Sequence, residues 1–141
     1  MKINSATSAQ IAASDASLST WLTANAGSGK TKVLIDRVAR LLLDGVQPEQ
    51  ILCLTYTKSA AAEMKNRLFD RLGKWSMLAD QELNLSLFET GIQRQLSTNE
   101  LKKARTLFAR AIEAPGGLKI QTIHAFCASL LRKFPLGAGI S

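Results

Sequence analysis

Apolar residues follow two kinds of spacing along the first half of the chain. Residues 19–23 are predicted to form a short strand, and 50–55 is an apolar-rich run typical of a buried parallel strand. Apolar residues recur at helical spacing over 32–43, and strong helix formers fill 58–73. The order strand, helix, strand, helix predicts an α/β fold with a parallel sheet.

Local breaking signals mark the ends of these first elements. A short helix is expected at 8–14, inside a polar lead-in. Asp44 and Gly45 end the helix at 32–43, because glycine is favoured just past a helix C-terminus. Pro48 then opens a short connection to the next strand.

The middle of the chain is predicted to be helical. Leu83, Leu87 and Phe88 indicate one helix. A second runs from residue 99 to about 114, with one apolar face and Thr98 as its candidate N-cap. This stretch interrupts the α/β pattern, so we expect it to be an insertion.

The last part of the chain returns to strand and helix. Residues 115–117, Pro-Gly-Gly, break the preceding helix. A third strand is predicted at 119–122 and a helix at 124–133. The predicted organisation has three parts: a core at 1–73, a helical insertion at 74–117, and a strand–helix unit at 118–141 that returns to the core.

Composition places the chain among globular proteins, and its charge is compatible with a polyanionic partner. Its 141 residues are 46% apolar, enough for one domain with a hydrophobic core. The formal net charge is +7. Residues 1–56 carry five Lys/Arg and four Asp/Glu, whereas 57–141 carry thirteen and seven. The basic excess therefore lies away from the N-terminal third, and indicates either a polyanion-binding surface or a solvated helix face.

The two cysteines and the length of the apolar runs indicate the cellular compartment of the protein. Cys53 and Cys127 lie in apolar runs without metal-ligand spacing, so we expect buried, reduced thiols in a cytoplasmic protein. No apolar stretch approaches the length of a membrane span, and the N-terminus lacks the apolar core of a signal peptide. We therefore expect no membrane association.

A phosphate-binding motif joins the first strand to the first long helix. It fits the P-loop pattern, with alanine where the first glycine usually stands. Its glycines allow close approach of the backbone, Lys30 would reach the β/γ-phosphates, and the Thr31 hydroxyl would hold Mg²⁺. The alternative is a flexible turn. The predicted nucleotide-binding residues are Ala24, Asn25, Ala26, Gly27, Ser28, Gly29, Lys30 and Thr31.

The acid that usually completes such a site is harder to find. A P-loop NTPase holds Mg²⁺ with a second acid at a strand tip. Asp44 follows three leucines but ends the P-loop's own helix, roughly 20 Å from Lys30. Asp80 lies in the helical segment and is followed by glutamine. We therefore expect nucleotide binding without efficient hydrolysis, from either an N-terminal fragment or a degenerate domain; the unfinished α/β pattern favours the fragment.

Three separated motifs together resemble the UvrD/Rep family of superfamily 1 DNA helicases. Residues 24–31 resemble helicase motif I, 51–64 resemble motif Ia, and 121–127 resemble the Thr-x-His motif, in the family's order. Residues 116–127 and 131–135 are most similar to the AddA branch. These RecB-related helicase–nuclease subunits act in bacterial double-strand break repair.

The resemblance implies a nucleotide site and a DNA site. ATP and Mg²⁺ are the implied cofactors, with Lys30 and Thr31 in catalytic roles and Gln10 reading the adenine. Taken alone, Gln10 would be an ordinary surface glutamine. Tyr56 stands where the family has phenylalanine and would stack on a base, although packing is the commoner role of such a residue. The implied DNA-contacting residues are Thr55, Tyr56, Thr57, Lys58, Thr122 and His124.

The resemblance also implies a function and partners. The chain would be the ATP-binding part of a DNA helicase, with single- or double-stranded DNA as substrate and an AddB-like second subunit. Motif II, the arginine finger, the second RecA-like domain and the nuclease domain are absent from this sequence, so we expect the chain alone to be inactive in unwinding. A small-molecule P-loop kinase would leave 51–64 unexplained. A non-catalytic nucleic-acid-binding module stays open, and predicts DNA binding that survives Lys30→Ala.

Overall fold

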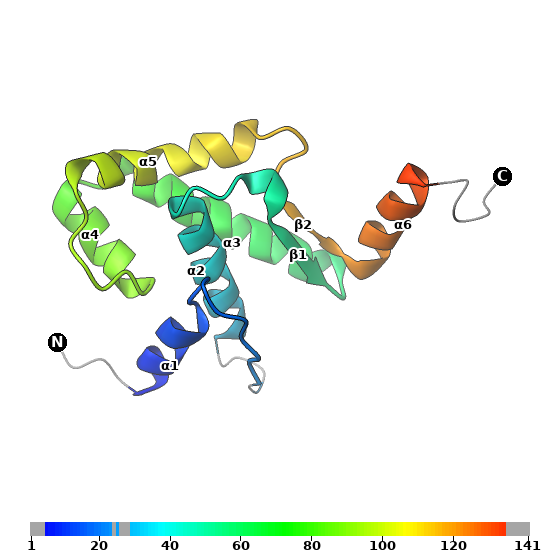
Figure 1. Cartoon of the computed structure of the whole chain (residues 1–141), viewed down its shortest axis with the longest axis horizontal. Coiled ribbons are helices and arrows are strands. Elements are labelled where there is room, and N and C mark those ends of the chain that lie inside the picture. The colour runs from blue at the N-terminus through cyan, green and yellow to red at the C-terminus, as the bar shows by residue number, and fades with distance from the viewer. Residues whose placement is uncertain (1–4, 24, 26–28, 135–141) are drawn as a thin grey trace.

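A computed structural model describes residues 5–23, 25 and 29–134. Within them the chain forms six helices, a two-stranded sheet and a 3₁₀ turn at Pro48–Gln50 (Figure 1). Helix α3 lies between α5 and the sheet, and α6 projects from the far side of the strands. The elements are α1 (Ser5–Ala13), α2 (Lys30–Leu43), β1 (Leu52–Thr55), α3 (Lys58–Met77), α4 (Asp80–Glu89), α5 (Thr98–Glu113), β2 (Lys119–Thr122) and α6 (Ile123–Lys133).

The sheet is parallel, which confirms the mixed α/β prediction. Strands β1 and β2 pair in a register that sets Leu52 against Lys119 and Thr55 against Thr122. The expectation that β1 is fully buried is wrong. Leu52 and Leu54, alternate residues that point to the same face of the sheet, are 43% and 44% exposed.

The strand predicted at 19–23 is also wrong. These residues form an irregular segment that pairs with neither β1 nor β2, and Trp21 within it is 91% exposed. An apolar run becomes a strand only where a neighbouring strand accepts and donates its ladder of hydrogen bonds. Residues 19–23 do not lie along either strand in this way, so the segment stays irregular.

The predicted helices form, with small shifts at their ends. The helix expected at 8–14 is α1, and the helix after the P-loop begins at Lys30 and ends at Asp44 as its C-cap. Gly45 then takes a φ of 98°, a left-handed conformation that glycine adopts without a steric penalty. Helix α3 runs four residues beyond its predicted end, because Trp75 near its C-terminus is buried in the core.

The N-cap of α5 differs from the prediction by one residue. Ser97, rather than Thr98, precedes the helix, and its hydroxyl accepts a hydrogen bond from the backbone N–H of Glu100. The Glu100 carboxylate in turn accepts from the Ser97 backbone N–H at 2.8 Å. This reciprocal capping box explains the shift, since only Ser97 has a glutamate three residues later.

The hydrophobic core lies among the helices rather than on the sheet. Helix α3 packs against both α5 and α2, and α4 closes the other side of α5. Phe69 and Phe108 add an edge-to-face contact between α3 and α5, with ring centroids 6.2 Å apart. Residues 74–117 therefore contribute to the same core as α2. Its most deeply buried large side chains are Leu42, Leu68, Leu72, Trp75, Leu83, Leu87 and Leu107.

The two cysteines do not share an environment. Cys53 on β1 is partly buried, and that burial raises the pKa of its thiol. Cys127 is exposed, so its predicted burial is wrong, because α6 packs mainly on the two short strands and buries none of its residues. Both thiols are free. Among the described helices, none combines the length and apolar character needed to cross a membrane.

Candidate functional site

The N-terminal end of α2 has the features of an anion site. Gly29 is the N-cap with a φ of 86°, and its carbonyl accepts the first hydrogen bond of the helix, from the Val33 N–H. Among the described residues, no side chain caps this end, and the first turn contains no acidic residue. The backbone N–H groups and the positive end of the helix dipole are therefore directed at an incoming anion. The predicted residues Ala24, Ala26, Gly27 and Ser28 lie outside the described residues.

Lys30 begins α2, and its side chain reaches back to Asn25. Its ammonium donates a hydrogen bond to the Asn25 carbonyl oxygen at 3.1 Å. Thr31 follows on the first turn of α2 and is partly exposed. The two residues predicted to hold phosphate and Mg²⁺ therefore lie in the first turn of α2, and their roles stay predictions.

Gln10 joins this site from a different helix. A Cβ added to Gly29 would lie 2.7 Å from the Gln10 side-chain nitrogen. The left-handed backbone favours glycine here, and the Gln10 amide lies close to the space that a side chain would occupy. The structure brings the predicted adenine-reading residue to the N-terminal end of α2.

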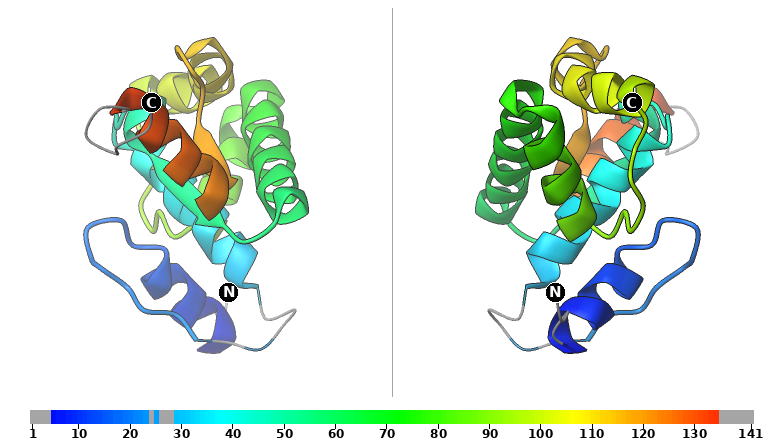
Figure 2. Two further views of the ribbon diagram at one scale, coloured as in Figure 1. Left: turned by 90° about the vertical axis from the view of Figure 1, so that its right-hand side faces the viewer. Right: turned by 90° about the vertical axis from the view of Figure 1, so that its left-hand side faces the viewer.

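The predicted DNA-contacting residues lie together at the end of the sheet where both strands finish. Because Thr55 pairs with Thr122, the chain leaves both strands at the same level. Figure 2 shows both strands ending on the side of the molecule where α2 begins. Tyr56 is 88% exposed just beyond β1, and His124 is exposed just beyond β2.

The threonines at this edge shape its turns. The Thr57 hydroxyl caps α3 by accepting from the Ala60 N–H at 3.1 Å. The Thr122 hydroxyl caps α6 in the same way, accepting from Ala125 at 3.1 Å. A threonine just before a helix is a known N-cap signal, so these caps could have been found in the sequence. Direct DNA contact by the threonines stays a prediction.

Thr55 takes part in the turn after β1. Its hydroxyl donates to the Thr57 carbonyl oxygen at 3.0 Å, which fixes the two residues that follow the strand. Tyr56 lies between them, and Lys58 begins α3 with an exposed side chain. The aromatic ring and the cation therefore extend from a turn whose backbone is held in place.

A buried ionic cluster joins α2 to α3. Asp36 on α2 is 2% exposed and accepts hydrogen bonds from Lys32, at 2.6 Å, and from Arg71 on α3. Desolvation lowers the pKa of both basic groups. No sequence pattern pointed to this cluster, because Lys32 and Asp36 at i,i+4 spacing are typical of a solvated helix face. It anchors α2, which begins at the P-loop, to α3, which begins at the Tyr56 turn.

The two acids rejected from the sequence remain away from the P-loop. Asp44 is the C-cap of α2, at the opposite end of the helix from Lys30. Asp80 lies in the first turn of α4 and pairs with Arg105 at 2.6 Å. In the part of the chain that the structure describes, no three histidine, cysteine or acidic side chains gather as a metal site.

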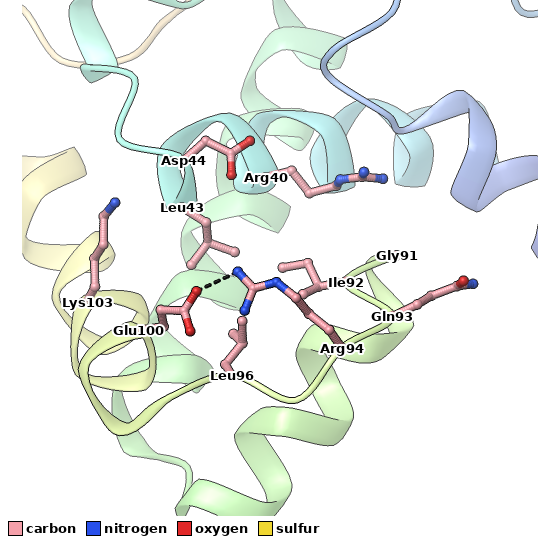
Figure 3. A pocket seen from close by; sticks show the side chains of 10 residues that line it. All are labelled: Arg40, Leu43, Asp44, Gly91, Ile92, Gln93, Arg94, Leu96, Glu100 and Lys103. Atoms are coloured by element: carbon pink, nitrogen blue, oxygen red, sulfur yellow. Dashed lines mark hydrogen bonds and ion pairs between the residues drawn. The ribbon is translucent and has the colours of Figure 1, made fainter.

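A cavity of about 610 Å³ opens at the C-terminal end of α2 (Figure 3). Arg40, Leu43 and Asp44 form one wall, and the segment between α4 and α5 forms the other. Arg94 pairs with Glu100 across it at 2.5 Å. This arginine, together with the Ser97 cap, lowers the pKa of Glu100 to about 2. Of the predicted site residues that the structure describes, none lines this cavity.

Comparison with known proteins adds a family to this geometry. The profile of the family described as UvrD/REP helicase N-terminal domain matches residues 5–140. A protein of Enterococcus faecalis, named as a subunit of an ATP-dependent helicase/nuclease, is 32% identical over 113 residues, covering 80% of this chain and 7% of that protein. Its namesake from Lactobacillus acidophilus is 34% identical, covering 80% of this chain and 8% of that protein. The chain thus spans less than a tenth of these relatives, and no solved structure matches it.

Proposed function

The chain belongs to the UvrD/REP helicase N-terminal domain family, and from this premise we propose that it is the ATP-binding part of an ATP-dependent DNA helicase. The relatives' shared name supports a helicase–nuclease subunit, which would act on DNA in recombinational double-strand break repair in the cytoplasm. An AddB-like second subunit would be its partner. We further propose that the fold is the beginning of a RecA-like P-loop domain.

The single observation that carries this proposal is the register of the sheet. Pairing of Thr55 with Thr122 sets the two predicted DNA-contacting turns side by side, facing the end of the molecule where α2 begins. A nucleotide site and a nucleic-acid site on one side of a small domain are what coupling between ATP and DNA requires. The two motifs that carry these turns lie far apart in the sequence, so the fold brings them together.

The N-terminal end of α2 fits a nucleoside triphosphate bound with Mg²⁺. Within the described residues its first turn has no side-chain cap and no acid, so it suits a phosphate group. Lys30 would leave the Asn25 carbonyl and donate to the β/γ-phosphates, while the Thr31 hydroxyl would face the metal. Gln10 would read the edge of the adenine. Bound ATP supplies the phosphoanhydride bond whose hydrolysis drives the helicase cycle.

The strand ends fit single-stranded DNA. Tyr56 offers an exposed ring on which a base can stack, and Lys58 a cation for the backbone phosphates. The capping bonds of Thr57 and Thr122 hold the turns that carry Tyr56 and His124. Because those turns are fixed before binding, less conformational freedom is lost when DNA is bound.

The ionic cluster at Asp36 gives these two halves a physical link. Lys32 on α2 and Arg71 on α3 both bond to its carboxylate, so the Asp36–Arg71 pair joins α2 to the C-terminal half of α3. A shift of α2 on nucleotide binding would therefore be passed to α3 and to the Tyr56 turn. Coupling of this kind needs an element that both sites bias, and the α2–α3 pair is that element in our proposal.

The test is ATP binding and hydrolysis by the 141-residue chain, with and without single-stranded DNA, beside Lys30→Ala. We expect Mg²⁺-dependent ATP binding that Lys30→Ala weakens by roughly tenfold or more, since hydrogen bonds to charged groups are strong. We expect turnover near background, because motif II is not in this sequence. DNA binding that ignores ATP and survives Lys30→Ala would contradict the proposal and support a non-catalytic nucleic-acid module.

A further inference from the structure

Helix α1 is poorly suited to hold its own position. It has nine residues, and helices this short are marginal in water without tertiary contacts. From Ser8 onward, Ala13 is its only buried side chain. No basic residue lies in its last turn to balance the negative end of the helix dipole. Yet α1 carries Gln10, whose amide must meet the P-loop end accurately.

Arg37 on α2 supplies donors that the end of α1 lacks. Its Nη1 donates to the Asp15 carbonyl oxygen at 2.5 Å and to the Ala13 carbonyl oxygen at 3.5 Å. Its Nη2 donates to the Leu18 carbonyl oxygen at 2.5 Å. One guanidinium therefore gathers the last residue of α1 and the segment that follows it, which only a planar group with several donors can do.

Arg40, one turn further along α2, holds the same region from the other side. Its Nη1 donates to the Ile11 carbonyl oxygen at 3.3 Å and to the Ser14 hydroxyl at 3.0 Å. Its Nη2 lies 3.7 Å from the Asp15 carboxylate. Figure 3 shows the Arg40 side chain turned away from Leu43 and Arg94, toward the blue N-terminal segment.

These contacts complete the C-terminal end of α1. The last carbonyl groups of a helix have no partners inside it and need outside donors. The Ala13 carbonyl accepts from Arg37, and the Ile11 carbonyl accepts from Arg40 and from the hydroxyl of Ser14. Ser14 is itself fully buried and also accepts from Arg40. Polar contacts from α2, rather than apolar packing, therefore hold the C-terminal end of α1, about one turn after Gln10.

We propose that Arg37 and Arg40 form a clasp that positions Gln10 against Gly29, and so sets the preference of the nucleotide site for adenine. They are positioning residues, because they act through α1 and do not touch the nucleotide. The inference rests on the proposed function, since it assumes that Gln10 reads a base. It assigns base recognition partly to side chains on the P-loop's own helix.

The clasp separates two properties of nucleotide binding. Phosphate affinity depends on Lys30 and on the first turn of α2, which begin well before Arg37 along the helix. Base preference depends on where Gln10 lies, because a displaced amide loses its hydrogen bonds to the base. Loss of the clasp should therefore abolish discrimination between ATP and GTP while leaving inorganic tripolyphosphate binding unchanged.

The experiment compares binding of ATP, GTP and tripolyphosphate to the full 141-residue chain with Mg²⁺ present. The variants are Arg37→Ala, Arg40→Ala, Gln10→Ala and the double variant Arg37→Ala with Gln10→Ala. Arg132→Ala, on the exposed α6, is the matched control. Amide hydrogen exchange of residues 5–18 reports directly on the docking of α1, with exchange in α3 as the reference for intact folding.

We expect wild type to prefer ATP over GTP by about tenfold, and Arg37→Ala to lose that preference. Arg37→Ala should speed exchange in residues 5–18 but not in α3, and the double variant should be no worse than Gln10→Ala. An unchanged ATP preference in both arginine variants would overturn the inference. If wild type bound ATP and GTP equally but still bound tripolyphosphate, the inference about the clasp would be wrong, whereas the proposed phosphate site would stand. Failure to bind any of the three would contradict the proposed function as well.

Discussion

The helical half of the molecule and the edge where the strands end are built by opposite rules. Among α2, α3, α4 and α5, seven large side chains, six leucines and Trp75, are almost completely buried and meet around α3. At the strand ends, Tyr56 is 88% exposed and α6 buries none of its residues. The buried apolar contacts are thus concentrated in the helical half, and the groups proposed to contact DNA lie at the strand ends. Substitutions should therefore affect stability or binding, but rarely both.

The two tryptophans give the largest test of this division. Trp75 is fully buried and its ring nitrogen donates to the Ser86 hydroxyl at 2.8 Å, whereas Trp21 is 91% exposed. We expect Trp75→Ala to lower the free energy of unfolding by about 3–5 kcal/mol, from lost burial and a cavity. Trp21→Ala should change it by less than about 0.5 kcal/mol. Urea denaturation followed by circular dichroism measures both, and equal effects would break the comparison.

The aromatic at the strand edge should show the reverse behaviour. Tyr56→Ala removes the ring proposed to stack on a base, so affinity for a short single-stranded oligonucleotide should fall by about 1–3 kcal/mol. Its unfolding midpoint should stay at the wild-type value, because the side chain is 88% exposed. Tyr56→Phe should retain affinity, since stacking needs only the ring.

Met77→Ala is the matched control for Tyr56. Met77 is equally exposed, at 88%, but lies at the C-terminal end of α3, away from the strand ends. Fluorescence anisotropy of a labelled oligonucleotide should give wild-type affinity for this variant. A loss of affinity as large as that of Tyr56→Ala would mean that exposed apolar side chains act without regard to their position.

The smallest expected effect is a pH dependence in the helical half. Hydrogen bonds from Arg94 and Ser97 lower the Glu100 pKa from 4.5 to about 2. A carboxyl whose folded pKa is depressed stabilises the protein above its unfolded pKa, and that contribution disappears as the pH falls from 4.5 to about 2. Glu100→Gln should therefore have a lower unfolding midpoint than wild type at pH 7.

Repeating the Glu100 comparison at low pH checks the sign. The gap in midpoint between wild type and Glu100→Gln should narrow between pH 4.5 and about 2, the interval set by the two pKa values. Glu82→Gln, at an exposed position on α4, controls for the loss of one surface charge. If the difference in unfolding midpoint stayed constant over this interval, the Glu100 carboxylate would not stabilise the protein in the way proposed.

Local chemistry explains which elements could be predicted. The end of α2 at Gly45 and the strand at 119–122 follow from turn residues and apolar runs that act over a few positions. The segment 19–23 could not be judged this way, because a strand depends on a neighbour that the pattern does not name. Cys127 has an apolar sequence context but lies on a helix that packs mainly on the two strands, so its exposure is a property of the packing.

The candidate site divides in the same way. Lys30 and Tyr56 could be predicted because each lies inside a recognisable motif. Asp36 could not, since its burial depends on Arg71 from another helix. Arg37 shows the same limit, because its partners lie in a segment that precedes it by more than fifteen residues. Sequence motifs identify the residues predicted to contact a ligand. The residues that position those contacts can be identified only from the three-dimensional structure.

The parallel pairing of β1 with β2 has a consequence for the order in which the chain folds. Leu52 must find Lys119, with α3, α4 and α5 between them in the sequence. Contacts between distant residues form slowly, because a long loop must close before any hydrogen bond compensates for it. We expect the helices to assemble first and the two strands to pair late. The edge proposed to hold DNA would then be the last part to form and the first to open, while the helical core remains intact.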